Sequence, residues 1–541
     1  MPESVELPHG ERRQLILLIS AWVLLAAITI LFAKQNLSVP GLYYDEAVFG
    51  GMAKDFISGP AHPHIPEAEI IMLGGRPFPL LVQPYLGGLK TWILMPSLAV
   101  FGSTVPVLRL TALIWAIIAL LLLMLAVWRW LGLSLSIVTG MLLAFDPNWF
   151  FLSVLDWGAA VPSFFCRGAC LYFVMKWIAG PKRLNAFLAG LFAGLGFFNK
   201  ADFALLLTGG AVAATLCYWR EVRAAGGRLA RAIVPFVSGF ILGCAPLLTK
   251  IPWIFAKATA ASTPPVSAQL EEKLNALTAI ADGTYFYRLM SAGGVFERMY
   301  QISINTHGGL PLGLLIAAAA IIFAITRRYI SSKLKRAALF TFTACLLITV
   351  MVVALPLAVR IHHFALAMPL PQLFIAIAIA AVFDMPVTTT FAKRLKLAAV
   401  LIAIASLVAS QLRVIQGTQE LIRRTGGRGW WSDSLDSFCR EIRTRSDLTI
   451  VSLDWGFNEQ LGFLTDGPKL KEPFWSFEEK PETLPSDPHY IYLTHPSEYT
   501  EYGYDTRYLE GARNSAVPVK IERHLDREGQ VAFYSIQFEP H

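Results

Sequence analysis

Long blocks of apolar residues, separated by short polar stretches, run through the first 413 residues of the chain. A helix needs about 20 apolar residues to cross a bilayer core roughly 30 Å thick. About eleven blocks approach that length, and the pattern therefore predicts a polytopic α-helical membrane protein. The predicted spans are 15–33, 106–128, 133–150, 158–178, 184–198, 202–219, 232–250, 309–326, 337–357, 364–383 and 396–413.

Composition excludes a string of soluble domains, which a length of 541 residues would otherwise permit. Hydrophobic residues make up 55% of the chain and charged residues 16%, whereas about 25% of a typical soluble domain is charged. The mean hydropathy is +0.52. These values are typical of a chain that is mostly surrounded by membrane lipid.

The net charge of +8 combines +15 over residues 1–413 with −7 over residues 414–541. A basic chain suggests nucleic acid as a partner, but here the excess bases lie in short loops between apolar blocks. The positive-inside rule accounts for bases in such loops. We therefore expect membrane lipids and no nucleic acid among the partners.

The same rule orients the chain. With Arg12 and Arg13 on the inner side, alternation of the spans places every strongly basic short loop on that side. It places segments 34–105 and 251–308, the link around Asp156 and the tail outside. We therefore divide the chain into two domains, which are a transmembrane domain, 1–413, with outer loops 34–105 and 251–308, and an outer C-terminal domain, 414–541.

Two outer regions have patterns of their own. Segment 34–105 is rich in Gly and Pro, and its amphipathic pieces, such as 46–57 and 85–98, are expected to lie along the membrane surface. In the tail, residues 448–453 and 489–493 are predicted strands. The runs 517–523 and 531–538 alternate around a polar turn, which predicts a terminal hairpin. We expect the tail to be a small α/β domain.

Two acidic sites are predicted at the outer surface. Asp45 and Glu46 open an amphipathic stretch about ten residues after the first span, and Asp156 lies in a short outer turn. A structural explanation exists for each, since Asp45 suits a helix N-cap and Asp156 suits a solvated end of a span. The length of the loop after Asp45, which exceeds that of a simple connector, favours a functional role.

Bases on the outer side are exceptions to the positive-inside rule and need an explanation. They are Lys200, Arg360, His362 and His363. Snorkelling or a local pair of Lys200 with Asp202 would be the structural explanation. The functional one is an anionic headgroup, since a phosphate at the membrane surface needs nearby cations.

Other motifs point to structure. Gly190 and Gly194 have the spacing of a helix-packing interface. His62 and His64 have no third ligand at metal-binding spacing. No phosphate-binding loop or dinucleotide fingerprint is present, so nothing supports nucleotide hydrolysis or the binding of a cytosolic sugar nucleotide.

Together these residues resemble the GT-C glycosyltransferases, in particular the branch of the protein O-mannosyltransferases and the lipid A aminoarabinose transferase. The resemblance covers most of residues 1–413. The motifs that carry it are Tyr44-Asp45-Glu46-Ala47 after the first span, Gly75-Arg-Pro-Phe-Pro79, Pro84-Tyr-Leu-Gly-Gly88, Asp156 in the next outer loop, the segment from Gly194 to Lys200, and the pair His362-His363 at the start of a late span.

The resemblance implies an inverting enzyme that takes a sugar from a polyprenyl-phosphate donor at the outer face of a bacterial inner membrane. Asp45 would be the general base, and Glu46 and Asp156 would orient substrates or tune Asp45. Lys200 and Arg360, with His362 and His363, would stabilise the departing phosphate. The acceptor would be lipid A or its core, another envelope glycan, or a protein.

One departure from the family bears on cofactors. The aminoarabinose transferase carries Glu-Lys-Pro-Pro where this chain has Val82-Gln83-Pro84-Tyr85. The acid and base tied there to metal and phosphate are missing, so the resemblance does not assign a cofactor or that particular acceptor, and a divalent metal remains an open alternative. Arg76 or Lys90 is a candidate for the missing lysine, and the sequence does not choose between them.

Two other classes of function stay open at this stage. One is a transporter or flippase of a lipid-linked sugar, which would need charged residues along a path inside the spans. The other is an envelope assembly protein without catalysis, in which Asp45 would be replaceable. The clustering of the charged residues at one surface favours the glycosyltransferase.

Overall fold

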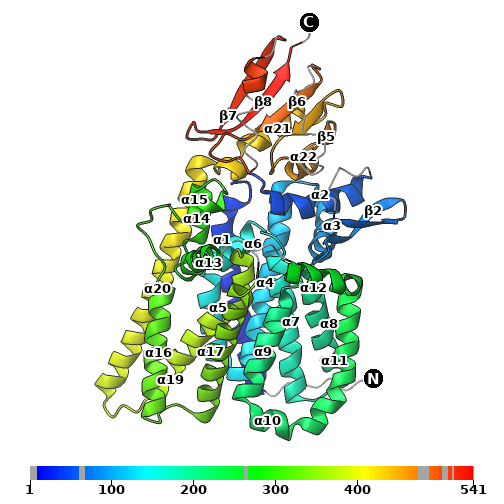
Figure 1. The fold of residues 1–541 in the computed structure, drawn as a ribbon. Coiled ribbons are helices and arrows are strands. Elements are labelled where there is room, and N and C mark those ends of the chain that lie inside the picture. Colours follow the sequence, from blue (N-terminus) through cyan, green and yellow to red (C-terminus); the bar gives the residue numbers. More distant parts are fainter. Residues whose placement is uncertain are drawn as a thin grey trace.

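The computed structural model describes residues 9–59, 67–260, 266–356, 358–472, 487–501, 510–514 and 517–539; His62 and His64 lie outside these ranges. Figure 1 shows a bundle of long helices with a smaller domain at one end, which contains the C-terminal strands. The short helix α10 (Trp219–Ala224) lies at the opposite end of the bundle.

Each predicted span coincides with a helix or, in one case, with a pair of helices. They are α1 (His9–Ala33), α4 (Val105–Leu131), α5 (Leu133–Ala144) with α6 (Pro147–Val154), α7 (Ala160–Ala179), α8 (Arg183–Asn199), α9 (Phe203–Cys217), α11 (Gly226–Cys244), α16 (Leu310–Thr326), α17 (Ser332–Val353), α19 (Leu370–Asp384) and α20 (Thr390–Thr425). The prediction of a polytopic helical membrane protein is confirmed.

The number of full crossings is smaller than the predicted eleven when length and hydropathy are applied strictly. Among the described residues, six helices are long and apolar enough to cross a membrane, or seven if α5 and α6 count as one bent span. Helices α9 and α16 are apolar but have only 15 and 17 residues. α20 continues past residue 413 to Thr425.

The predicted span 133–150 is broken. Helices α5 and α6 meet at an angle of 66°. Asp146 at the break caps α6 by accepting hydrogen bonds from the backbone N–H groups of Asn148 and Trp149, at 2.9 and 3.2 Å. Pro147 follows at the first helical position, where its missing N–H has no cost. The break turns the chain towards the link that carries Asp156.

The helix-packing prediction for Gly190 and Gly194 is confirmed. A Cβ at Gly190 would lie 1.9 Å from the carbonyl oxygen of Phe236, and one at Gly194 would lie 2.1 Å from that of Phe240. Both partners belong to α11, so only glycine allows α8 and α11 to approach this closely.

Segment 34–105 forms a layer between the bundle and the C-terminal domain. It contains the short helix η1 (Lys34–Asn36), α2 (Tyr44–Ser58), the antiparallel strands β1 (Glu69–Leu73), β2 (Arg76–Gln83) and β3 (Leu86–Gly87), and α3 (Leu89–Phe101). The pieces predicted at 46–57 and 85–98 correspond to α2 and α3. The strands were not predicted.

Helix α2 does not lie on the surface as predicted, because most of its residues are buried against α3, β2 and the C-terminal helix α22 (Asn458–Leu464). The turn between β1 and β2 is made by Gly74 and Gly75, whose φ angles of +60° and +78° suit a tight hairpin.

Helices α14 (Tyr285–Ser291) and α15 (Phe296–Met299) of segment 251–308 lie at the same end of the bundle as α2 (Figure 1). The other elements of this segment are α12 (Ile251–Ala260) and α13 (Val266–Ala281). The 3₁₀ helix η2 (Ala245–Lys250) precedes the segment, and α18 (Ile361–Phe364) and η3 (Ala365–Ala367) precede α19.

The tail is an α/β domain, as predicted. After the short helices η4 (Gly429–Trp431) and α21 (Ser434–Ile442), its sheet has the strand order β5-β4-β6-β8-β7. Strands β4, β5 and β6 are parallel, and β8 and β7 form the predicted hairpin. The strands are β4 (Thr449–Ser452), β5 (Lys469–Lys471), β6 (Tyr490–Thr494), β7 (Val519–Leu525) and β8 (Val531–Phe538).

Candidate functional site

Asp45 lies in the first turn of α2 at the end of the bundle that faces the C-terminal domain. It is not the helix N-cap, because the N-cap residue is Tyr43 and no side chain caps the helix there. The Asp45 side chain is half-buried. Burial raises the pKa of its carboxyl, and the nearby Lys90, Trp157 and Lys200 oppose that rise.

Glu46 has a different environment from its neighbour. Its carboxylate is fully buried and accepts two hydrogen bonds from Arg109, at 2.8 Å from Nε and 3.0 Å from Nη2. Arg109 also donates to the carbonyl oxygens of Asn36, Pro40 and Gly41. A bidentate pair of this kind fixes geometry as well as charge. Glu46 therefore ties the start of α2 to α4 and to the loop after α1.

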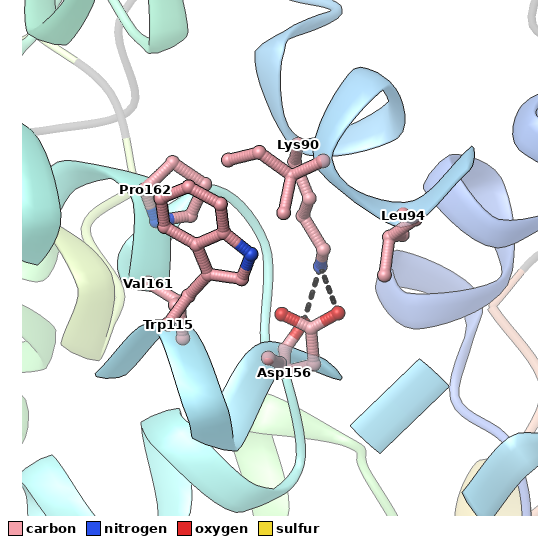
Figure 2. Close-up of a pocket in the computed structure, with 8 residues that line it drawn as sticks. Lys90, Leu94, Trp115, Asp156, Val161 and Pro162 are labelled. Carbon is pink, nitrogen blue, oxygen red and sulfur yellow. Dashed lines mark hydrogen bonds and ion pairs between the residues drawn. The ribbon is translucent and has the colours of Figure 1, made fainter. Parts of the chain in front are cut away.

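Asp156 is buried rather than solvated, with 1% of its surface exposed. Lys90 Nζ lies 3.1 Å from Asp156 Oδ2 and also donates to the backbone carbonyl of Asp156 (Figure 2). It donates in addition to the backbone carbonyl of Gly158 at 2.8 Å. Burial raises the pKa of Asp156 to about 7, and the ammonium of Lys90 opposes this shift. The structure thus places Lys90, one of the two candidate bases, at the acidic turn.

Arg76, the other candidate, lies away from this turn. Its side chain is exposed, and Nη1 donates to the carbonyl of Ile57 at 2.8 Å, near the end of α2. Of the two candidates, Lys90 contacts a predicted site residue, while the Arg76 side chain donates hydrogen bonds to carbonyls at the end of α2.

The turn at Asp156 has an unusual backbone. Asp156 has φ of +48° and Gly158 has φ of +56°. The left-handed region is unfavourable for residues with a side chain, although Asp tolerates it better than most. Such conformations persist only where surrounding contacts impose them. The three contacts from Lys90 supply that restraint.

Figure 2 also shows a small cavity between the Lys90–Asp156 pair and the apolar residues Leu94, Trp115, Val161 and Pro162. Its volume of about 10 Å³ is the size of one water molecule at most. It is too small to bind a lipid or a sugar, so the substrates are not expected to bind there.

Lys200 and the two histidines are brought together. Lys200 Nζ lies 3.2 Å from Asp202 Oδ2 and 3.3 Å from His363 Nε2. His363 Nδ1 accepts a hydrogen bond from the backbone N–H of Arg360 at 3.0 Å. The local pair with Asp202 that the sequence suggested is present, and Lys200 contacts His363 as well.

His362 packs beside Trp157, with ring centroids 6.5 Å apart. Its buried Nδ1 has no hydrogen-bond partner among the described residues. A Cβ placed on Gly158 would lie 3.9 Å from this atom and 4.0 Å from Asp45 Oδ2. His362 and Asp45 therefore flank the same glycine, from elements more than 300 residues apart in the chain.

Arg360 precedes the two histidines and is half-buried. Its guanidinium pairs with Glu272 of α13 and lies over the ring of Phe296, 3.6 Å from the centroid. The positive charge of Arg360 opposes the rise in pKa that burial causes at the hydroxyl of Tyr43, two residues before Asp45. The structure thus gathers the predicted site residues around the start of α2, and four of them, Glu46, Asp156, Lys200 and Arg360, have charged partners within the protein.

Aromatic side chains from three segments surround this region. Tyr43 stacks on Trp431, with centroids 4.0 Å and planes 4° apart, and packs against Trp157 at 5.4 Å. Trp455 packs on Tyr44 at 4.5 Å. Trp431 and Trp455 belong to the C-terminal domain, which therefore contributes directly to the surroundings of Asp45.

The residues present do not fit a divalent metal ion. Two of the three carboxylates at this site, Glu46 and Asp156, are already paired with Arg109 and Lys90, which leaves Asp45 alone as a free carboxylate ligand. Among the described residues, no group of three His, Cys, Asp or Glu side chains has metal-binding geometry. We derive no step through a metal.

Sequence reasoning missed Arg109 and named Lys90 only as one of two candidates. Arg109 lies inside a predicted span, where an ionisable residue is a signal of a paired or functional role. Lys90 was recognised only as an alternative, because its partner Asp156 is 66 residues away.

The chain matches no protein-family model and no curated protein sequence. Its fold, however, is similar to solved structures of the aminoarabinose transferase ArnT from Cupriavidus metallidurans, at 12% sequence identity. The alignment with the apo state has a TM-score of 0.56 and covers 96% of this chain and 99% of ArnT. The alignment with ArnT bound to undecaprenyl phosphate has a TM-score of 0.54 and the same coverage.

An oligosaccharyltransferase from Archaeoglobus fulgidus, in the apo form, is also similar, with a TM-score of 0.50 and 12% identity over 94% of this chain and 69% of that one. Both neighbours are GT-C glycosyltransferases. The resemblance to the GT-C fold that the sequence predicted is thereby confirmed.

Proposed function

We propose that the protein is an inverting glycosyltransferase that moves a sugar from a polyprenyl-phosphate donor to an acceptor hydroxyl. The observation that carries the proposal is the arrangement around Gly158, where the carboxylate of Asp45 and the free Nδ1 of His362 flank one point near Lys200. The GT-C fold, seen in ArnT with bound undecaprenyl phosphate, supports it.

Asp45 acts as the general base in this proposal. It accepts the proton of the acceptor hydroxyl as the oxygen attacks the anomeric carbon. The raised pKa of the buried carboxyl makes it a stronger base than an exposed aspartate, while Lys90 and Lys200 keep the ionised form accessible.

The bond from the anomeric carbon to the phosphate oxygen breaks as the new glycosidic bond forms, and the polyprenyl phosphate leaves with its negative charge. Phosphate is a good leaving group, so cations suffice to stabilise it. Lys200 and His363 are in contact, and His362 is adjacent with a free ring nitrogen. Arg360 joins them once the phosphate replaces Glu272 as its partner.

Glu46 and Asp156 position the base rather than exchange protons. Glu46 anchors the first turn of α2 through Arg109, and Asp156 with Lys90 shapes the turn on which Asp45 and His362 converge. A single displacement from one face of the sugar inverts the anomeric configuration.

The proposed location is a bacterial inner membrane, with the N-terminus in the cytoplasm and the C-terminal domain in the periplasm. The acceptor is an envelope component, namely lipid A or its core, another glycan or a protein. The basic connection at α10 lies at the opposite end of the bundle from the C-terminal domain, as this orientation requires (Figure 1).

The test uses the purified full-length protein in lipid nanodiscs and a panel of polyprenyl-phosphate sugars. Release of free polyprenyl phosphate is followed with and without an envelope extract, and the product's anomeric configuration is determined. Release that depends on the extract, with inversion, is the expected result. A transfer product with retained configuration would contradict the single displacement.

A flippase is distinguished in liposomes that carry the same donors. Movement of a donor between leaflets without any sugar transfer would replace the glycosyltransferase proposal by the transporter alternative.

A further inference from the structure

Helix α2, which carries Asp45 in its first turn, is in contact with the C-terminal domain from one end to the other. At its start, Tyr43 stacks on Trp431 and Tyr44 packs on Trp455. In its middle, a Cβ on Gly50 would lie 3.0 Å from ring atoms of Phe463. The C-terminal domain thus follows α2 along its whole length.

The strongest contact is made by Lys54, near the end of α2. Its ammonium donates to the carbonyl oxygens of Gly462, Phe463 and Thr465, at 3.1, 2.9 and 2.6 Å. It also pairs with Asp466 at 2.8 Å. Only 6% of Lys54 is exposed, so this is a buried cation with every donor used.

These carbonyls belong to the last turn of α22 and to the residue that follows it. The final carbonyls of a helix lack intrahelical partners and carry partial negative charge, and a cation placed there satisfies both needs. Lys54 of α2 therefore caps the C-terminal end of α22 with a buried ammonium. The two helices are more than 400 residues apart in the chain.

On its other side α2 is fixed to the membrane domain by the pair of Glu46 with Arg109. The position of Asp45 consequently depends on two anchors, one from each domain. Lys54 is nine residues from Asp45, about 14 Å along the helix at 1.5 Å per residue. It does not reach the reacting atoms itself.

We propose that Lys54 is a positioning residue for Asp45, and that through it the C-terminal domain is an integral part of the catalytic centre. The proposal rests on the proposed function, since it assigns the domain a task in the same transfer. It predicts that loosening the contact lowers kcat, because a displacement of about 1 Å in a catalytic group is enough to slow a reaction by up to a hundredfold.

The test compares two substitutions that each remove one basic partner of Asp466 in the full-length protein. Lys54→Met deletes the ammonium on α2 and keeps the apolar stem. Arg443→Met deletes the exposed guanidinium that pairs with the same carboxylate at 2.9 Å and leaves Lys54 with its carbonyl partners in place. Comparing the two variants distinguishes the effect of losing the cap on α22 from the effect of a general loss of stability in the C-terminal domain.

Two measurements are made in nanodiscs. The first is hydrogen–deuterium exchange of the amides at the start of α2. Lys54→Met is expected to speed it by about tenfold, as the loss of a buried charge-assisted cap implies, and Arg443→Met is expected to leave it unchanged. The second is donor turnover, for which Lys54→Met should lower kcat by tenfold to a hundredfold with an unchanged KM for the donor.

Unchanged exchange at the start of α2 in Lys54→Met would overturn the proposal whether or not a donor is found. A raised KM with an unchanged kcat would also overturn it, since that would assign the contact to substrate binding. If the wild type transfers no sugar, the proposed function fails while the exchange result still decides the positioning.

A second variant covers the case in which Lys54→Met does not fold. Lys54→Gln removes the ammonium and its pair with Asp466, but keeps an amide N–H group as a donor at the same position. It is expected to lower kcat with an unchanged donor KM. A wild-type kcat in this variant would contradict the proposal.

Discussion

Asp45 and Glu46 are adjacent in the chain, but their side chains leave the helix about 100° apart. One faces the cationic residues at the Asp156 turn, and the other is sealed against Arg109. The sequence resemblance predicted different roles for the two residues, but the environment of Glu46 could not be predicted, because it depends on Arg109, which lies 63 residues further along the chain.

Glu46→Gln tests the anchoring role. The substitution leaves the Arg109 guanidinium buried without a charged partner, which costs about 3–5 kcal/mol when one half of a buried pair is removed. Thermal unfolding in detergent should show a clearly lowered midpoint. The control is Glu420→Gln, which removes one half of an exposed i,i+3 pair with Arg423, and it should unfold like the wild type.

Lys90→Met tests the electrostatics of the base. The Lys90 ammonium lowers the pKa values of Asp45 and Asp156, so its removal raises both. In the proposed mechanism Asp45 works in its ionised form, so activity should be lost as pH falls through its pKa. The acidic limb of kcat/KM should therefore move to higher pH in Lys90→Met.

The matched control for this shift is Arg76→Met, which removes an exposed cation that lies away from the Asp156 turn. Its acidic limb should coincide with that of the wild type. An equal shift in both variants would show that surface charge, rather than Lys90, sets the pKa of the base.

At the scale of elements, the positions of the spans were predictable because each depends on local composition alone. The break between α5 and α6 was missed although Asp146-Pro147 is a strong helix start, since the apolar run continues through it. Strand β2 was missed for a different reason. It contains Pro77 and Pro79, which weaken the signal of a strand, and its partner β1 has no signal without it.

The packing of α8 on α11 gives a prediction at this scale. Gly194→Leu places a side chain where the backbone of Phe240 lies, so the two helices must separate and the protein should lose stability or fail to accumulate in the membrane. Gly210→Leu is the control, because a Cβ there has open space around it, and its expression and unfolding should match the wild type.

At the scale of the whole molecule, the C-terminal domain is recognisable from its strand pattern, but its contact with α2 is not. That contact joins residues more than 400 positions apart, and no periodicity in the sequence encodes such pairs. The same is true of the meeting of Asp45, Lys200 and His362, which resemblance suggested and the fold places together.

The orientation of the chain is testable with two introduced cysteines. Ser437→Cys lies on the exposed surface of α21 in the C-terminal domain, and Ala224→Cys lies on the exposed end of α10. A membrane-impermeant maleimide applied from the outer side should label Ser437→Cys and leave Ala224→Cys unlabelled until the membrane is opened. Labelling in the reverse order would invert the proposed topology.

The most direct test of the central claim is the rate of sugar transfer by Asp45→Asn, measured beside the wild type and Asp384→Asn in nanodiscs. Asp384 is exposed at the end of α19 and lies outside the proposed site. We expect Asp45→Asn to lose at least about a hundredfold in transfer, as removal of a general base does, while Asp384→Asn transfers at the wild-type rate. Equal transfer by Asp45→Asn and the wild type would contradict the assignment of Asp45 as the base.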